Sequence, residues 1–330
     1  KESLPHQRTS GSTLTIGGTM LVDKVLGRGH LLRVSARKIL CEYLYLTAPS
    51  REASSVCREV DTFAIVNYQK PCPGGVVGRY IGVPDKGDVR DEHDPREVVV
   101  KNARELEQSP TLEFKGFQLV NHSTQVQDFR ADEEVKRVYY SEVEALVKDL
   151  TGAARVIVFD HTVRESGLNN LNNLGAENTA AASVSRVHCD YTEDSAPKRL
   201  RQLAEKASYT GVKLSAAEAE EIAGRRFAFV NVWRNIRSSP VAARPLAVCD
   251  PATVRPDSRM LYELRYEDRT GLNYSLPYEP GHKWYYYPGM TRDECLVFKV
   301  YDSRPQGPRF VFHTAFDDPR SPEGAPPRHS

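Results

Sequence analysis

The chain has 330 residues, enough for one large domain or two modest ones. Apolar residues make up 40% and charged residues 27%, a balance typical of globular proteins that excludes a disordered chain. Because 45 Lys and Arg face 44 Asp and Glu, the net charge is only +1. No overall field therefore favours nucleic acid or an acidic membrane surface, and a small, roughly neutral substrate fits better than a polyanionic partner.

Membrane insertion and secretion are not predicted either. No segment reaches the roughly 18 apolar residues that cross a bilayer. The most apolar N-terminal stretch, residues 14–25, is interrupted by Gly17, Gly18 and Asp23, so no secretory signal is expected. The six cysteines are scattered without a C-x-x-C pair, which excludes a zinc knuckle or a disulfide framework. We expect a cytoplasmic protein.

The first 60 residues are difficult to interpret, and we expect an N-terminal extension of uncertain structure. Their only regular feature is a basic amphipathic stretch from Val25 to Leu46 that could be helical. Short β-like runs begin at residues 63–66. The Pro/Gly-rich residues 71–84 and the charged residues 85–97 predict loops.

Three helices are predicted among later strands. Apolar residues recur on one stripe over 132–150, and Gly152 follows as a C-cap glycine. A second helix is expected over 197–209, and a third begins at the capping box of Ser215 and Glu218. Residues 165–183 predict a surface loop. Strands are expected over residues 114–120, 155–159, 184–191, 226–236, 245–249, 260–266, 283–287, 295–301 and 309–316.

Many short strands, few helices and no βαβ rhythm favour a double-sheet β fold over a Rossmann sheet. No G-x-G-x-x-G or Walker sequence is present. We therefore predict a mostly β fold over residues 61–330, with flanking helices around a jelly-roll (double-stranded β-helix, cupin-like) core.

One histidine has the spacing of a metal ligand pair. Of nine histidines, only His188 has an acid two positions later, Asp190. Side chains alternate along a strand, so these two point to one face and Cys189 to the other. An imidazole and a carboxylate suit Fe(II) with open positions, and they also suit Zn²⁺. The third ligand is expected from a distant strand on the facing sheet. His313 is the candidate, unless it only packs in the core.

An Arg-x-Ser triplet, Arg328-His329-Ser330, follows His313. Arginine offers a planar fork to a carboxylate, and the hydroxyl adds another donor. The same pattern also begins at Arg8, Arg33, Arg164 and Arg237, so its position after His313 is the distinguishing mark.

A series of ordered segments makes the chain resemble, from about Thr62 to Ser330, a family of bacterial and fungal natural-product oxygenases. That family includes the hydroxylase component of cephamycin methoxylation and the fungal gibberellin desaturase. The segments are residues 116–117, 121–122, 140–153, 159–164, 187–192, 231–234, 245–247, 282–286, 301–303, 313–316 and 327–330.

The resemblance implies a jelly-roll core, Fe(II), 2-oxoglutarate and O₂, with ascorbate in support. It implies oxidation of an unactivated C–H bond in a small natural-product intermediate, by hydroxylation, desaturation or oxidative cyclisation. His188, Asp190 and His313 match its metal triad. Arg328 and Ser330 match the position of its 2-oxoglutarate clamp.

Four further residues are candidates for substrate binding. Arg164 and Arg234 could hold a carboxylate of substrate or cosubstrate, or form buried ion pairs. Tyr191 is expected to border the iron, and Trp233 to line the pocket or pack in the core.

Three rival functions stay open at this point: a cupin-like metal-binding protein, a zinc hydrolase, and a cysteine-nucleophile enzyme using Cys189. The substrate is not readable from the sequence, and a homodimer is one alternative for the oligomeric state.

Overall fold

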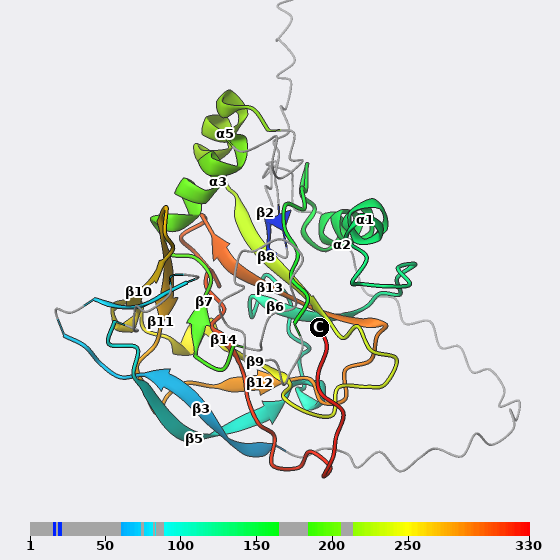
Figure 1. Cartoon of the computed structure of the whole chain (residues 1–330), viewed down its shortest axis with the longest axis vertical. Helices are drawn as coiled ribbons and strands as arrows, with labels where there is room; N and C mark the ends of the chain where they lie inside the picture. The colour runs from blue at the N-terminus through cyan, green and yellow to red at the C-terminus, as the bar shows by residue number, and fades with distance from the viewer. Residues whose placement is uncertain are drawn as a thin grey trace, which may run out of the picture.

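Two β-sheets and two groups of helices make up the described part of the chain (Figure 1). The structure is a computed structural model, and it describes residues 16–17, 19–21, 61–73, 76–81, 83, 89–164, 184–205 and 214–330. The helix considered within residues 25–46 and the loop predicted over 165–183 lie outside these residues.

The larger sheet is mostly antiparallel and curls from β3 and β5, at the bottom of Figure 1, to β10 and β11 at its left. Its nine strands, in order across the sheet, are β3 (Thr62–Gln69), β5 (His93–Asn102), β12 (Trp284–Tyr286), β9 (Leu246–Cys249), β14 (His313–Ala315), β7 (His188–Cys189), β11 (Thr270–Ser275), β10 (Met260–Arg265) and β4 (Val77–Tyr80). Strands far apart in the chain are therefore neighbours, and β7 lies between β14 and β11.

The smaller sheet is built around β13 (Glu294–Asp302), in which every residue is buried. Its neighbours are β6 (Phe117–Asn121) and β8 (Ala228–Arg234). A short hairpin, β1 (Ile16–Gly17) and β2 (Thr19–Leu21), adds to the free side of β8. Part of the expected N-terminal extension thus joins the body of the fold.

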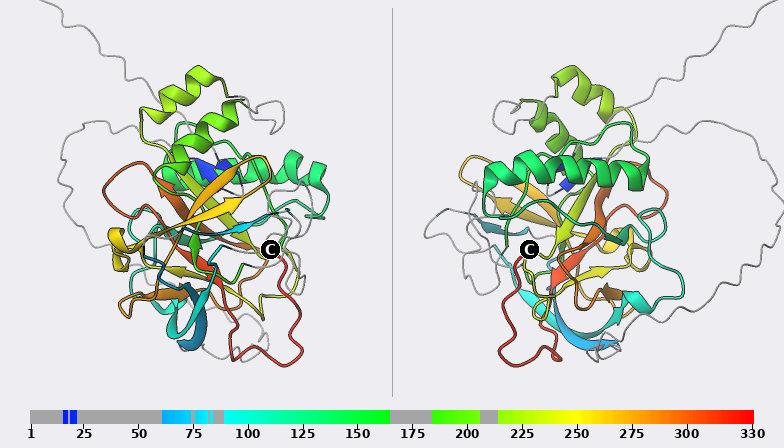
Figure 2. Two further views of the ribbon diagram at one scale, coloured as in Figure 1. Left: turned by 60° about the vertical axis from the view of Figure 1, so that its left-hand side comes forward. Right: turned by 90° about the vertical axis from the view of Figure 1, so that its right-hand side faces the viewer.

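The helices gather at the end of the molecule opposite β3 and β5 (Figures 1 and 2). The predicted helix over 132–150 is confirmed as α1 (Asp132–Glu134), a π-helical segment (Val135–Tyr139) and α2 (Tyr140–Thr151) in succession, closed by Gly152 at φ 64°. The second helix is α3 (Ser195–Glu205). The third, α5 (Ala216–Ala223), has both hydrogen bonds of the predicted capping box. Short 3₁₀ helices cover Ala103–Glu105, Pro251–Thr253 and Pro256–Ser258.

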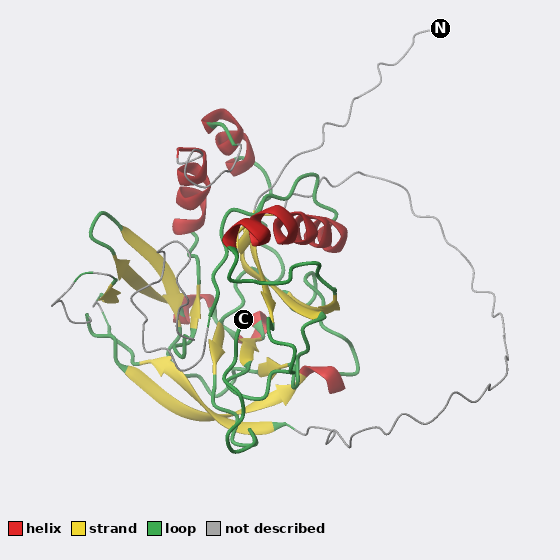
Figure 3. Ribbon diagram, turned by 45° about the vertical axis from the view of Figure 1, so that its right-hand side comes forward, coloured by secondary structure: helices red, strands yellow, loops and turns green. Residues whose placement is uncertain are grey.

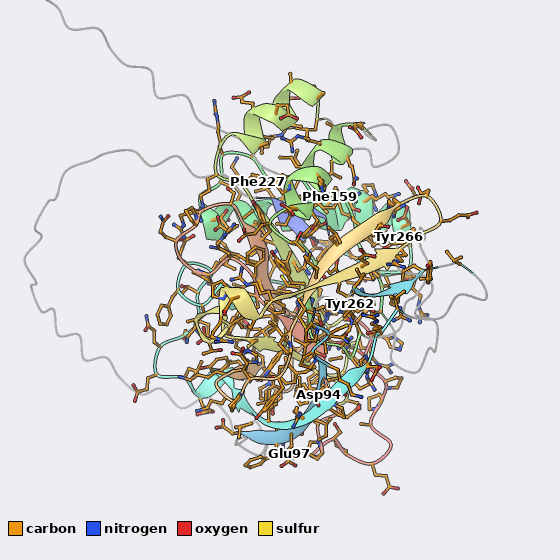
Figure 4. All side chains as sticks on the ribbon, turned by 90° about the vertical axis from the view of Figure 1, so that its left-hand side faces the viewer. Asp94, Glu97, Phe159, Phe227, Tyr262 and Tyr266 are labelled. Atoms are coloured by element: carbon orange, nitrogen blue, oxygen red, sulfur yellow. The ribbon has the colours of Figure 1, made fainter. Side chains whose placement is uncertain are left out.

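The predicted loops over 71–84 and 85–97 were partly wrong. The first contains β4, and the second contains the start of β5, where polar and charged residues such as Asp94 and Glu97 lie on the outer part of the sheet (Figure 4). Such a strand pairs through its backbone while its side chains stay in water, so its composition resembles that of a loop.

One predicted strand is absent, and one observed strand was not predicted. Residues 155–159 form no strand, although Val156 and Val158 are buried. Strand β11 was not predicted, because the run Thr-Gly-Leu-Asn-Tyr-Ser lacks a clear apolar alternation. Among the described residues, no helix has both the length and the apolar character that a bilayer crossing requires.

The core lies between the two sheets. Phe298 of β13 packs on His313 of β14, with ring centroids 4.8 Å apart, and Phe117 of β6 packs on Tyr285 of β12 at 5.8 Å. The predicted mostly β fold is confirmed. In this packing the short strands β7 and β14 are held side by side against the smaller sheet, which fixes the histidines that they carry.

Candidate metal centre and its cavity

The structure brings the three predicted metal ligands together. One ligand atom from each of His188, Asp190 and His313 lies within 4.8 Å of the others. The Asp190 Oδ1 atom is 3.5 Å from His188 Nε2 and 3.8 Å from His313 Nε2. His313 was expected on the facing sheet, which is wrong: β14 is the direct neighbour of β7, and His313 is the cross-strand partner of His188.

Both imidazoles are held so that Nε2 faces the shared point. His188 Nδ1 lies 2.8 Å from the carbonyl of Arg186, and His313 Nδ1 lies 3.2 Å from the carbonyl of Val311. A carbonyl can only accept, so each Nδ1 carries the proton and each Nε2 has a free lone pair. Burial lowers the pKa of His188 well below its ordinary value, helped by His313 and Arg186, and burial also lowers the pKa of His313. Neutral imidazoles are the form that binds a metal.

The carboxylate is positioned from the other sheet. Asn231 Nδ2, on β8, donates a 2.7 Å hydrogen bond to Asp190 Oδ2. The other oxygen, Oδ1, is the one that faces the imidazoles. A group that orients a metal ligand in this way raises the affinity for the metal. The sequence alone did not indicate this role for Asn231.

The triad opens on a cavity of about 580 Å³. Its wall combines apolar residues, among them Val163, Leu264 and Tyr266, with basic ones and with the acids Asp91 and Asp160. Tyr266, labelled in Figure 4, follows β10 at the side of the body. A pocket of this size and mixed lining suits a small molecule.

The C-terminal segment closes one side of this cavity, and the C-terminus lies in the middle of the body in Figures 1 and 3. Arg164 and Ser330 exchange two backbone hydrogen bonds, of 2.6 and 2.9 Å. Arg328 is buried, donates from Nη1 to the carbonyl of Arg244 at 2.7 Å, and lies 5.6 Å from the ring centre of Trp233. Burial lowers the pKa of Arg328 to about 9, together with the neighbouring Arg164 and Arg244.

Tyr191 and Trp233 both line the cavity. Tyr191 stacks on Phe229 with ring centroids 4.5 Å apart, and Trp233 is half-buried on β8. Trp233 also packs against the hydrophobic core, so both alternatives for it describe part of its surroundings.

Arg234 also lines the cavity, and its guanidinium is hydrogen-bonded to protein groups. Its Nε donates to the Tyr139 hydroxyl at 3.1 Å, Nη1 donates to the carbonyl of Arg292, and Nη2 meets the carbonyl and Nδ1 of His122 at 2.7 Å. All three nitrogens form hydrogen bonds with protein groups, and none of these groups is a carboxylate. Arg234 therefore connects β8 to neighbouring loops through these hydrogen bonds, and its binding of a carboxylate stays a prediction.

Cys189 does not fit the role of a nucleophile. It is fully buried, it does not line the cavity, and its thiol donates to the carbonyl of Val300 at 3.2 Å. Burial raises its pKa well above the ordinary value, so the reactive thiolate is suppressed at neutral pH.

Comparison with known proteins identifies the family of the chain. Residues 66–330 match the family model described as "Oxidoreductase/YMDC permease-like domain". The hydroxylase/desaturase efuI of Hormonema carpetanum is 32% identical over 74% of this chain and 84% of its own length. The Fe(II)/2-oxoglutarate-dependent dioxygenase nvfI of Aspergillus novofumigatus is 32% identical over 72% and 81%. A solved structure titled "iron and alpha-ketoglutarate-dependent endoperoxidase NvfI" superposes with a TM-score of 0.67 at 26% identity, covering 82% of this chain and 94% of that one.

The chain belongs to this oxidoreductase family and is an Fe(II)/2-oxoglutarate-dependent dioxygenase with a jelly-roll core. Its cofactors are Fe(II), 2-oxoglutarate and O₂. A cupin-like binding protein and a zinc hydrolase, the rival functions on the same fold, are not favoured by these relatives.

Proposed function

We propose that His188, Asp190 and His313 bind the catalytic Fe(II). The observation that carries this proposal is the convergence of their ligand atoms within 4.8 Å, with both imidazoles anchored through Nδ1. Two neutral imidazoles and one carboxylate would hold Fe(II) and would leave it able to take the cosubstrate and O₂.

Arg328 and Ser330 hold the distal carboxylate of 2-oxoglutarate in this proposal, with Arg164 beside them. The Ser330 hydroxyl oxygen is buried and has no hydrogen-bond partner among the described residues. Arg328 is 3% exposed, and the adjacent cation Arg164 adds to the positive potential. A buried guanidinium next to an unused hydroxyl fits a carboxylate, because charge-assisted hydrogen bonds offset the cost of burial.

When bound, Fe(II) and 2-oxoglutarate supply O₂ activation, with 2-oxoglutarate oxidised to succinate and CO₂ as a C–H bond of the substrate is oxidised. The protein positions that substrate and excludes water from it. Tyr191 and Trp233 form part of the cavity wall in this arrangement. The cavity of about 580 Å³ leaves room for a small molecule in addition to the cosubstrate.

We propose a natural-product intermediate as substrate and hydroxylation, desaturation or oxidative cyclisation as outcome. Relatives bear the names hydroxylase/desaturase and endoperoxidase, which supports this range of outcomes. We also propose that the chain is related to the hydroxylase component of cephamycin methoxylation and to the fungal gibberellin desaturase.

An anaerobic spectrum tests the assignment of the site. Fe(II) and 2-oxoglutarate added to the protein should produce a visible charge-transfer band, and O₂ with ascorbate should then yield succinate. His188→Ala and Asp190→Ala should lose both signals, whereas Glu97→Ala, at an exposed carboxylate of β5 outside the cavity, should keep them. A band of full intensity in either ligand variant would show that the triad is wrongly assigned.

A further inference from the structure

Arg186 is a buried arginine beside the triad whose side chain has no function in the mechanism above. It is 7% exposed, lines the same cavity as His188, and stands two residues before it. Because side chains alternate in extended chain, Arg186, His188 and Asp190 share one side of this segment, whereas Val187 and Cys189 are fully buried.

The guanidinium is held but not neutralised. Its Cζ atom lies 3.4 Å from the centre of the Tyr262 ring on β10, and Figure 4 shows Tyr262 in the middle of the body. Nη1 is buried and has no hydrogen-bond partner in the described parts of the chain. A buried donor of this kind is costly unless a ligand or water satisfies it.

The acids nearest to Arg186 bind other groups, although the buried Oδ1 atom of Asp91 has no hydrogen-bond partner among the described residues. Asp91 Oδ2 accepts a 2.5 Å hydrogen bond from the Tyr262 hydroxyl. Asp190 faces the two imidazoles through Oδ1 and Asn231 through Oδ2. Arg79 of β4 lines the cavity too and adds positive charge beside Arg186.

The position of Arg186 separates it from the proposed 2-oxoglutarate clamp. The Arg186 guanidinium lies over Tyr262 of β10. Strand β10 is two strands from β7, with β11 between them, and this corresponds to a separation of about 10 Å. Arg328 instead contacts Arg244 and Trp233, on the side of β9 and the smaller sheet. One cavity therefore presents cationic groups at two ends, and 2-oxoglutarate needs only one of them.

We propose that Arg186 binds a carboxylate of the substrate, so that the enzyme acts on an acidic small molecule. The near-zero net charge of the chain suggested a neutral substrate, but the local charge of the cavity decides what enters it. The inference rests on the proposed function of the triad. The cavity wall also includes the apolar surface of Leu264 and Tyr266, which suits the hydrophobic skeleton attached to such a carboxylate.

The test compares matched acids and methyl esters on the protein loaded with Fe(II) and 2-oxoglutarate under argon. Benzoate, 2-naphthoate and 9-anthroate, each with its methyl ester, are titrated by calorimetry. At least one acid should bind wild type tighter than its ester by roughly tenfold or more, as a charge-assisted hydrogen bond predicts. Arg186→Gln should abolish that preference and Arg186→Lys should restore part of it. Arg269→Gln, a cavity arginine paired with Asp268, should retain it.

The charge-transfer band of the same samples distinguishes a failure of the Arg186 proposal from a failure of the proposed function. Arg186→Gln should keep the wild-type band and the wild-type affinity for 2-oxoglutarate, which also shows that the variant is folded. Loss of 2-oxoglutarate binding in this variant would make Arg186 part of the cosubstrate clamp and overturn the proposal. Equal affinities of wild type for every acid and its ester, or a preference that survives in Arg186→Gln, would also overturn it. No band in wild type would instead refute the proposed function.

Discussion

His188 and His313 lie directly opposite each other in the antiparallel pair of β7 and β14, with ring centroids 4.3 Å apart. Each ring is fixed in the same way, through Nδ1 to the carbonyl of the residue two positions before it. The sheet therefore sets the spacing of two ligands through backbone pairing alone. Only the third ligand, Asp190, needs support from the other sheet.

That support leads to a first prediction. In Asn231→Ala the Asp190 carboxylate loses its 2.7 Å hydrogen bond and can rotate away from the metal. We expect Fe(II) affinity to fall roughly 10- to 100-fold, the usual effect of losing such a partner. Anaerobic Fe(II) titration measures it. Asn273→Ala, at another asparagine of the cavity wall, is the control. Unchanged affinity in Asn231→Ala would mean that Asp190 is oriented by something else.

Substitutions in the proposed clamp should lower the affinity for 2-oxoglutarate, and the loss should be larger at Arg328 than at Ser330. Arg328→Gln removes a buried charge-assisted donor worth about 1.5–3 kcal/mol, so the Kd should rise roughly 10- to 150-fold. Ser330→Ala removes one neutral donor and should raise it by roughly 2- to 10-fold. Titration of the charge-transfer band gives both values. Arg255→Gln, at an exposed arginine paired with Glu279, should match wild type, and a larger effect of Ser330 than of Arg328 would contradict the assignment.

Local patterns predicted the fold where one face of an element is apolar and its ends are marked. The stripe that ends at Gly152 and the capping box of Ser215 and Glu218 are of this kind. Strands whose partners lie elsewhere in the chain carry weaker signals. Strand β5 begins with charged residues because its side chains there reach solvent, and β11 depends on pairing with β10 and β7.

The site shows the same division. Alternation placed His188 and Asp190 on one side of a strand, and the structure agrees. The sequence could not reveal that β14 pairs with β7, because register between distant strands is set by the whole sheet. Arg186 obeys the same alternation and could have been found from it. The partners of Arg234 come from three separate segments, so its engagement was not visible.

A buried network of charged side chains should make the stability of the fold depend on pH in the acidic range. Lys299 and Asp302 are 2% and 1% exposed and lie 2.9 Å apart, and Arg226 adds a second bond to Asp302 at 2.8 Å. Burial alone would raise the pKa of Asp302, but Arg226 and Lys299 lower it. A carboxyl whose folded pKa is depressed stabilises the fold above its unfolded pKa of about 4, and this contribution is lost as pH falls further.

The variant Asp302→Asn leaves the Lys299 ammonium buried without its closest acid. We expect a loss of about 3–5 kcal/mol in the free energy of unfolding at pH 7, measured by urea denaturation. The difference from wild type should shrink between pH 5 and pH 3, where wild type itself loses the interaction. Glu92→Gln, in the exposed pair with Lys70, should leave the urea midpoint unchanged. A constant difference across this pH range would show that Asp302 stabilises by packing and not by charge.

Gly116 connects backbone geometry to the metal site. It adopts φ +77°, and a Cβ atom there would lie 2.9 Å from Pro308 Cβ and 2.9 Å from Val311 Cγ2. Val311 is the residue whose carbonyl accepts from His313 Nδ1. A methyl group at position 116 must therefore displace the chain that fixes one of the metal ligands.

Gly152 provides the matched control for this effect. It has a similar φ of +64°, but nothing lies within 4 Å of an added Cβ. Gly152→Ala should cost only the left-handed strain, about 1–2 kcal/mol in the free energy of unfolding, with Fe(II) affinity unchanged. Gly116→Ala should cost about 1–3 kcal/mol more because of the clash, and it should also weaken Fe(II) binding. Urea denaturation and Fe(II) titration of both variants decide the matter. Equal stability losses would show that Pro308 and Val311 yield without strain, and normal Fe(II) affinity in Gly116→Ala would show that the orientation of His313 does not depend on the position of Val311.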